Sequence, residues 1–264
     1  MRKKFVVLKK LGMFVSCCLM LGSVFASGGR AGLQQVHNDL HDKASLQRGV
    51  KLYVNYCQGC HALELMRYKS MAQDLGMNNQ DGQVLEALVQ KNLNFVSDKI
   101  TDPMKTAMPK KMAEGWFGVP PPDLTLAARV RGPNWIYSYL KGFYKDESRP
   151  WGVNNIVFPD VAMPHVLLEL QGTQLPQYEM VRFEGESGEL LEQKAIKHLT
   201  LETSGSMTEA EYDQAVTDLV NFLEYAGEPH KLERKRLGVW VILFLIIFTL
   251  FAYLLKREYW KDVH

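Results

Sequence analysis

A pair of cysteines directly before a histidine is the feature that most constrains this chain of 264 residues. Cys57, Cys60 and His61 form a Cys-x-x-Cys-His motif within "YVNYCQGCHAL". Cys-x-x-Cys pairs occur in redox dithiols, in zinc sites and in the covalent attachment of haem. Only haem attachment needs a histidine at the next position, where its imidazole reaches the iron from the same turn of helix. The motif therefore predicts one covalent c-type haem, attached through Cys57 and Cys60 and ligated by His61.

The two other chemistries fit the remaining sequence less well. Zinc needs further soft ligands at comparable spacing, but the other cysteines, Cys17 and Cys18, lie in an apolar N-terminal run. A thioredoxin-like dithiol belongs to a βαβ pattern, and no such alternation surrounds Cys57. Without the N-terminal segment the chain keeps only the motif cysteines, so we expect its stability to come from a packed core and the haem.

The first 26 residues have the three regions of a secretory signal peptide. Residues 2–10 are basic, residues 11–25 are apolar, and Ser23 and Ala26 supply small residues for cleavage after Ala26. An uncleaved N-terminal anchor is the alternative, and the shortness of the apolar run disfavours it. Export agrees with the motif, because c-type haem is attached outside the cytoplasm.

A second apolar run, from Leu237 to Leu255, contains no charged residue. Its length matches the ~20 residues that span a bilayer, and aromatic residues near both ends favour the membrane interface. Basic residues flank both ends, so the orientation follows from the signal peptide. We expect residues 27–230 to form a periplasmic haem domain, 237–255 a single anchor helix in the inner membrane, and 256–264 a cytoplasmic tail.

The segment between these two membrane signals is long enough for one domain of ordinary size. Apolar residues recur at helical intervals over residues 44–56, 84–93, 134–143 and 208–225. Thr208 and Glu211 form a capping box at the start of the last of these helices.

Two further stretches, 110–123 and 150–164, are rich in Gly, Pro and Asn and are expected to be loops. The predicted fold is therefore mostly α. It is a c-type cytochrome domain with long ordered loops around one covalent haem, plus a single C-terminal transmembrane helix.

The sixth iron ligand decides whether the site is open to small molecules or closed for electron transfer. Two methionines stand directly before a proline: Met108 in "AMPKK" and Met163 in "FPDVAMPHVL". Met163 lies in an apolar stretch, whereas two lysines follow Met108, so the residues favour Met163. His165 and His198 are rival ligands, although loop histidines are more often simply exposed.

Four stretches of the chain carry a family resemblance. They are "RGVKLYVNYCQGCHALELMRY" from Arg48, "PPDLTLAARVRG" from Pro121, "FPDVAMPH" from Phe158 and "LVNFLEYAGEPHKLERKRLGVWV" from Leu219. In this order, over almost the whole mature chain, they resemble the cytochrome c1 family in its bacterial form. These proteins are the haem subunits of ubiquinol–cytochrome c reductase (bc1) complexes. "PPDLT" and "MPH" before a terminal anchor are far more specific than the haem motif alone.

The resemblance implies the iron ligands. It makes Cys57 and Cys60 the thioether residues, His61 the proximal ligand and Met163 the distal ligand of one haem c. Met163 is thereby preferred over Met108.

The resemblance also implies residues of the haem pocket. Arg131 matches an arginine that pairs with a haem propionate, a role that suits its fork geometry, and Arg129 is its near neighbour. Pro121 and Pro122 resemble prolines that line the pocket. The chain is slightly shorter than familiar members after Arg131, which places Trp135 at the position of an aromatic haem neighbour.

The function implied by the resemblance is electron transfer in the respiratory chain. The chain would accept one electron from the Rieske iron–sulfur protein and pass it to a cytochrome c, beside cytochrome b in a dimeric complex. By itself it would be a carrier and not an enzyme. One alternative is a membrane-anchored monohaem cytochrome that serves a terminal oxidase. Another is a haem enzyme such as a peroxidase, which needs an open sixth position.

The segment 171–206 matches the family least. We interpret its acidic residues as the solvated face of a hairpin rather than a docking face: Glu179, Glu184, Glu186, Glu189 and Glu192. The formal net charge is +2, and no basic cluster with interleaved aromatic residues occurs. Binding of nucleic acid is therefore not expected.

Overall fold

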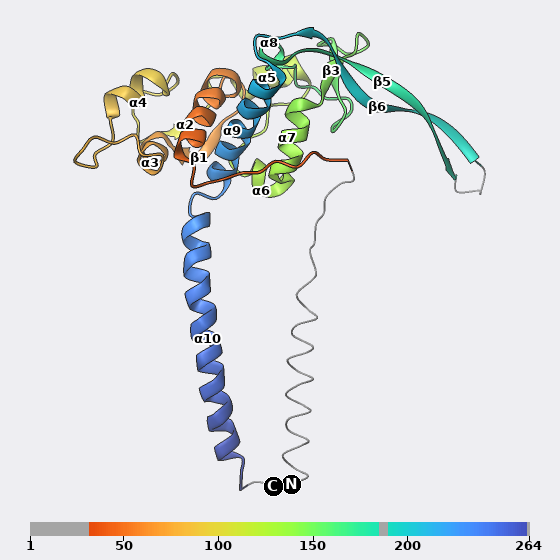
Figure 1. The fold of residues 1–264 in the computed structure, drawn as a ribbon. Helices are drawn as coiled ribbons and strands as arrows, with labels where there is room; N and C mark the ends of the chain where they lie inside the picture. Colours follow the sequence, from red (N-terminus) through yellow and green to blue (C-terminus); the bar gives the residue numbers. More distant parts are fainter. Residues whose placement is uncertain (1–31, 185–189, 263–264) are drawn as a thin grey trace. The chain divides into compact units, whose positions relative to one another are not determined.

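The structure is a computed structural model that describes residues 32–184 and 190–262 (Figure 1). The predicted signal peptide, residues 1–26, lies outside the described residues. The helices are α2 (Lys43–Leu52), α3 (Tyr68–Asp74), α4 (Glu86–Asn92), α5 (Lys110–Phe117), α6 (Ala127–Arg131), α7 (Pro133–Lys141), α8 (Leu168–Gln171), α9 (Glu209–Gly227) and α10 (Lys231–Tyr259). The strands are β1 (Leu63–Arg67), β2 (Pro103–Met104), β3 (Phe143–Lys145), β4 (Val153–Asn155), β5 (Gly172–Glu184) and β6 (Leu190–Ser204). They pair in antiparallel twos, β1 with β2, β3 with β4 and β5 with β6.

The core of the domain forms where α2 packs against α9 (Figure 1). A Cβ atom at Gly49 would lie 2.1 Å from the carbonyl oxygen of Asp218, so only glycine permits this close approach. Just beyond α2, the ring of Tyr53 meets that of Phe222 on α9 at 5.7 Å between centroids. Gly49 and Tyr53 both meet Phe222, so the close backbone contact and the aromatic contact adjoin each other.

A buried carboxylate holds the same two helices together. The Asp218 side chain on α9 is only 3% exposed. It accepts hydrogen bonds from the Ser45 hydroxyl at 2.7 Å and from Nε and Nη2 of Arg48 at 2.6 and 2.9 Å, all from α2. A buried charge is tolerated when it is paired and fully hydrogen-bonded. This cluster therefore fixes the position of α2 along the axis of α9.

The predicted helices are present in the described residues. Those expected over 44–56, 84–93, 134–143 and 208–225 correspond to α2 with its following turn, α4, α7 and α9. The capping box is also confirmed, since the Thr208 hydroxyl accepts from the Glu211 backbone while the Glu211 carboxylate accepts from the Thr208 backbone.

The prediction that residues 110–123 form a loop is wrong for the first part of that stretch. Residues Lys110–Phe117 form α5, which ends at Gly118 in the left-handed region with φ +78°. Glycine is favoured at such a helix end because it has no Cβ. The glycines that were interpreted as signs of a loop instead lie within α5 and at its end.

The prediction of a mostly α fold is correct only in part. The described residues contain more helix than strand, but β5 and β6 run for 13 and 15 residues and form a long hairpin. Register irregularities at Thr173/Gln174 and Gln177/Tyr178 interrupt the pairing. They break the period-two pattern by which a strand is recognised in a sequence.

The C-terminal helix α10 includes the whole of the predicted span 237–255. It has 29 residues, and its most apolar 18-residue window has a mean hydropathy of 2.7 with 0% buried within the structure. At 1.5 Å per residue it extends for ~44 Å, enough to cross a hydrocarbon core of ~30 Å. A long, apolar and fully exposed helix fits a single-pass membrane anchor.

The contact at Gly49 yields a stability prediction. In Gly49→Ala the added methyl group meets backbone, which cannot rotate away, so α2 and α9 must separate. We expect the free energy of unfolding to fall by about 3 kcal/mol, the upper end of the range for overpacked cores. Denaturant unfolding of the detergent-solubilised, haem-loaded full chain, followed by circular dichroism, measures this.

Gly115→Ala in α5 is the matched control, because nothing lies within 4 Å of a Cβ at that position. It should be neutral or slightly stabilising, by up to ~1 kcal/mol, because alanine favours a helix more than glycine does. Equal stability of the two variants would contradict the role assigned to Gly49.

Candidate haem site

The Cys-x-x-Cys-His motif lies at the turn that ends α2. The helix widens into a π-helical turn over Tyr53–Cys57. The backbone NH groups of Cys60 and His61 then both donate to the Cys57 carbonyl, at 3.0 and 2.8 Å. The buried Tyr53 hydroxyl donates to the His61 carbonyl at 2.7 Å. These bonds hold both cysteines and the histidine on one short turn.

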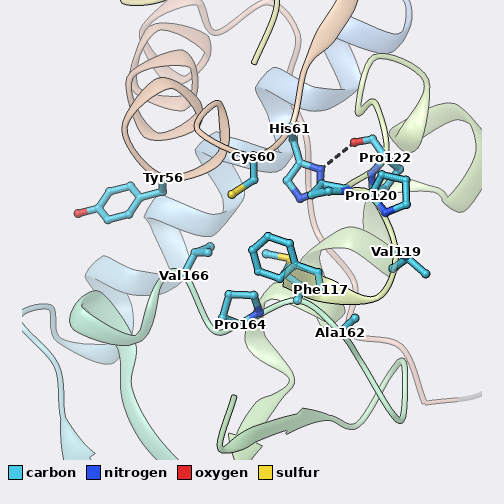
Figure 2. Close-up of a pocket in the computed structure, with 12 residues that line it drawn as sticks. Tyr56, Cys60, His61, Phe117, Val119, Pro120, Pro122, Ala162, Pro164 and Val166 are labelled. Atoms are coloured by element: carbon cyan, nitrogen blue, oxygen red, sulfur yellow. Dashed lines mark hydrogen bonds between the residues drawn. The ribbon is translucent and has the colours of Figure 1, made fainter. Parts of the chain in front are cut away.

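The imidazole of His61 is oriented by the carbonyl of Pro122. The two groups lie 2.7 Å apart at Nδ1, drawn as the dashed line in Figure 2. A carbonyl oxygen only accepts, so Nδ1 carries the proton and donates it. Nε2 keeps its lone pair and is able to bind a metal. In metal-binding histidines one ring nitrogen usually donates a hydrogen bond in this way while the other binds the metal. Burial lowers the pKa of His61, which favours the neutral, ligating form.

The segment that supplies the Pro122 carbonyl is itself fixed to the residues after the motif. The Leu124 NH donates to the Ala62 carbonyl at 2.9 Å. The Glu64 NH donates to the Asp123 carboxylate at 2.7 Å. The proline run, Pro120–Pro122, is therefore tied to the residues that come directly after the motif. His61 is held both by its own turn and by this run.

His61 and Met163 line one pocket. Figure 2 shows the imidazole and Pro122 on one side and Ala162 and Pro164 on the other. The space within the pocket, including the part open to solvent, is about 510 Å³. Its walls are mostly apolar: Tyr56, Cys60, His61, Phe117, Val119, Pro120, Pro121, Pro122, Ala162, Met163, Pro164 and Val166.

The rival ligands lie elsewhere. Met108 lines a neighbouring hollow together with Cys60, and His61 does not line that hollow. The His165 ring is stacked on Phe143 at 4.8 Å, and burial lowers its pKa to about 4. His198 is exposed on β6. Among the four, only Met163 shares the pocket with His61.

The cysteine thiols are not those of a redox dithiol. Cys57 is buried in the hydrophobic core, and burial raises the pKa of its thiol to about 12. Burial raises the pKa of Cys60 as well, and this side chain lines the pocket. Attacking thiols in redox motifs have lowered pKa values, so the environment here has the opposite effect.

Two hydrogen-bond donors near the pocket, the Arg131 guanidinium and the Trp135 indole, are suited to bind a carboxylate. The Arg131 guanidinium lies 5.0 Å from the centroid of the Trp135 ring. The Trp135 Nε1 is buried and has no hydrogen-bond partner among the described residues. Trp135 is stacked on Tyr139 at 5.0 Å, and the Tyr139 hydroxyl contacts the Met163 sulfur. A haem propionate would satisfy the orphaned indole and pair with Arg131, so the residues present fit this cofactor.

Arg129 is placed differently from the other predicted pocket residues. It lines a separate hollow with Glu224, Glu228 and Lys231 near the end of α9. The structure therefore brings Cys60, His61, Pro121, Pro122 and Met163 together around one pocket. Arg131 and Trp135 adjoin that pocket through Tyr139, whereas Arg129 does not line it.

Sequence reasoning gave no role to several residues that line or adjoin the pocket, among them Phe117 and Tyr139. Phe117 was hidden because its segment was expected to be a loop. Tyr139 was placed on a helix face without a role in the site. Its spacing contained a signal, because Trp135 and Tyr139 are four residues apart and so lie on one side of α7.

Comparisons with known proteins agree with this site. The sequence model described as the Cytochrome C1 family matches residues 34–263. Cytochrome c1 of Allochromatium vinosum is 48% identical over 257 residues, which cover 97% of this chain and 100% of the relative. The ammonia monooxygenase gamma subunit of Nitrosomonas europaea is 44% identical, with coverages of 90% and 92%. Cytochrome c1 of Rhodospirillum rubrum is 29% identical, with coverages of 92% and 95%.

The motif yields a prediction about covalent attachment. Replacement of both Cys57 and Cys60 by Ala removes the two sulfur atoms that form thioether bonds. We expect no haem-dependent peroxidase stain at the position of this chain on a denaturing gel. The Cys57→Ser,Cys60→Ser variant lacks the same two sulfur atoms and should be unstained as well. Wild-type chain from the same preparation is the positive control. Stain retained by the alanine variant would contradict c-type attachment.

Proposed function

Because the chain belongs to the cytochrome c1 family, we propose that it is the haem subunit of a respiratory bc1 complex. In this role it accepts one electron from the Rieske iron–sulfur protein and passes it to a cytochrome c. Like its family, the chain carries covalently bound haem c. The observation that carries the proposal is that His61 and Met163, a nitrogen and a sulfur ligand, line the same pocket.

Two protein ligands favour electron transfer over catalysis at the iron. With His61 on one side and Met163 on the other, no coordination position is left for oxygen or peroxide. The bound haem supplies a one-electron couple, and a methionine opposite a histidine raises its potential. Pro122 keeps the His61 ring in one orientation through Nδ1. The apolar walls exclude water, which also disfavours the additional charge of the oxidised state.

The surface beside the pocket supports contact with a redox partner. Large apolar side chains are exposed next to its opening: Met112, Trp116, Val119 and Trp151, each between 46% and 57% exposed. Trp151 lies 5.4 Å from the Phe117 ring, which lines the pocket. Electron-transfer partners form small, short-lived interfaces. Exposed apolar side chains of this kind suit such brief contact.

The membrane arrangement follows from the two ends of the chain. We place residues 27–230 in the periplasm, α10 in the inner membrane beside cytochrome b, and residues 256–264 in the cytoplasm of a dimeric complex. The predicted signal peptide supports this orientation. Ion pairs join the end of α9 to the start of α10, Glu224 with Lys231 and Glu228 with Arg234. The haem domain is thereby linked directly to its anchor.

Co-isolation tests the choice of complex. With an affinity tag on the C-terminal tail, we expect mild-detergent purification to recover cytochrome b and a Rieske protein in amounts similar to this chain. Mass spectrometry identifies the partners. Recovery of terminal oxidase subunits would instead favour the alternative of an oxidase-linked cytochrome. The name of the Nitrosomonas europaea relative makes monooxygenase subunits a third outcome, and it too would contradict the proposal.

Substitution of the distal ligand tests the site. Met163→Leu keeps the volume and apolar character of the side chain, so packing should change little. Loss of the thioether should lower the reduction potential by an amount on the order of 0.1 V, since axial ligands set haem potentials over ~0.8 V. Redox titration measures the shift, and the weak red charge-transfer band of the ferric protein reports sulfur ligation.

Met108→Leu is the matched control, because Met108 lies outside the pocket shared by His61 and Met163. It should leave both potential and band nearly unchanged. An intact band in Met163→Leu together with a lost band in Met108→Leu would show that the other methionine is the ligand.

A further inference from the structure

The hydroxyl of Tyr139 on α7 donates a hydrogen bond to the sulfur of Met163 at 3.3 Å. We propose that Tyr139 is a positioning residue that holds this thioether in place and raises the reduction potential of the site. The proposal rests on the proposed role of Met163 as the distal ligand. Tyr139 itself does not bind the iron, and its effect passes through the sulfur.

The Tyr139 hydroxyl has the Met163 sulfur as its hydrogen-bond acceptor. The bond to Met163 is the one hydrogen bond recorded for the Tyr139 hydroxyl within the described part of the chain. Buried tyrosine hydroxyls generally have a partner, and a thioether sulfur is a weak acceptor. A hydroxyl with a stronger acceptor in reach would turn to it. The arrangement therefore directs the proton at the sulfur and nowhere else.

The ring that carries this hydroxyl cannot easily move. It is stacked on Trp135, with centroids 5.0 Å apart and an interplanar angle of 10°. The edge of Phe143 meets it from another side, at 5.2 Å and 71°. Aromatic pairs at such distances contribute beyond the area they bury. The hydroxyl is thus presented to the sulfur from a rigid aromatic row.

The backbone of Tyr139 is joined to the loop that carries Met163. The fully buried Asn155, at the end of β4, donates from Nδ2 to the Tyr139 carbonyl at 2.7 Å. Its Oδ1 accepts from the NH groups of Val157 and Phe158, at 2.9 and 3.2 Å, where the loop toward Met163 begins. One amide therefore fixes donor and acceptor segments relative to each other, so the contact at the sulfur is built into the fold.

The physical effect of the bond has a definite sign. A thioether has two lone pairs, so one is available to a metal while the other accepts from Tyr139. The positive end of the hydroxyl dipole then points at the sulfur and withdraws electron density from it. Both effects disfavour the extra positive charge of the oxidised state. Hydrogen bonds of this kind around a metal site are a recognised means of tuning its potential.

A purely structural role for Tyr139 makes a different prediction, because the ring alone fills the space between Trp135 and Phe143. Tyr139→Phe removes only the hydroxyl and keeps the stacked ring. Tyr139→Leu removes both. A role in packing predicts that only the leucine variant differs from wild type, whereas a role of the hydroxyl predicts that both variants shift in the same direction.

The experiment is a redox titration of the haem-loaded full chain in detergent, with the ferric charge-transfer band recorded in parallel. For Tyr139→Phe we expect the ferrous-to-ferric ratio at a fixed ambient potential to fall about threefold, which is ~28 mV at ~59 mV per tenfold change for one electron. The band should shift but persist. Tyr137→Phe is the matched control on the same helix, since its hydroxyl bonds to Asp213 and lies outside the pocket. Its potential should equal that of wild type.

Three outcomes would overturn the proposal. A wild-type potential in Tyr139→Phe, with a shift only in Tyr139→Leu, would assign Tyr139 to packing alone. An intact band in Met163→Leu would remove the ligand assignment and this proposal with it. Loss of that band together with an unchanged potential in Tyr139→Phe would overturn the role of Tyr139 and leave the proposed function standing.

Discussion

The close contact of α2 with α9 is the constraint on which the rest of the domain depends. Gly49 lets the two backbones meet, and the Asp218 carboxylate binds both Ser45 and Arg48 across the contact. The haem motif follows at the end of α2, and the anchor helix α10 follows α9 after a short connection. A single helix contact therefore sets the position of the motif relative to the start of the membrane anchor. The loops of the domain only have to close over a motif that is already placed.

Those loops form the pocket from separate parts of the sequence. The motif turn supplies His61, the end of α5 supplies Phe117, the proline run supplies the carbonyl that orients the imidazole, and the loop after β4 supplies Met163. Short backbone hydrogen bonds join the proline run to the motif, and Asn155 joins the methionine loop to α7. Each segment is irregular by itself, yet each is fixed through contacts with a regular element. Such a pocket combines an apolar interior with two candidate ligands, His61 and Met163, held by defined contacts.

The parts that could be predicted from sequence are those with a local signature. The motif, the helices with a clear period and the capping box at Thr208 are of this kind, and the helices and capping box are present in the structure. Helix α5 was not predicted, because glycine and proline are typical of loops, whereas here Gly115 lies within the helix and Pro109 and Gly118 lie at its ends. The hairpin expected within 171–206 is present as β5 and β6, although register irregularities obscured the length of its strands. The bond from Tyr139 to Met163 joins residues 24 positions apart, and no local pattern reveals such a contact.

The burial of Cys57 has a consequence for biogenesis. In the folded chain its sulfur lies within the hydrophobic core. An attachment apparatus cannot reach a side chain in that position. Ligation must therefore come first and closure of the core second, so the nascent domain has to stay open until its cofactor arrives.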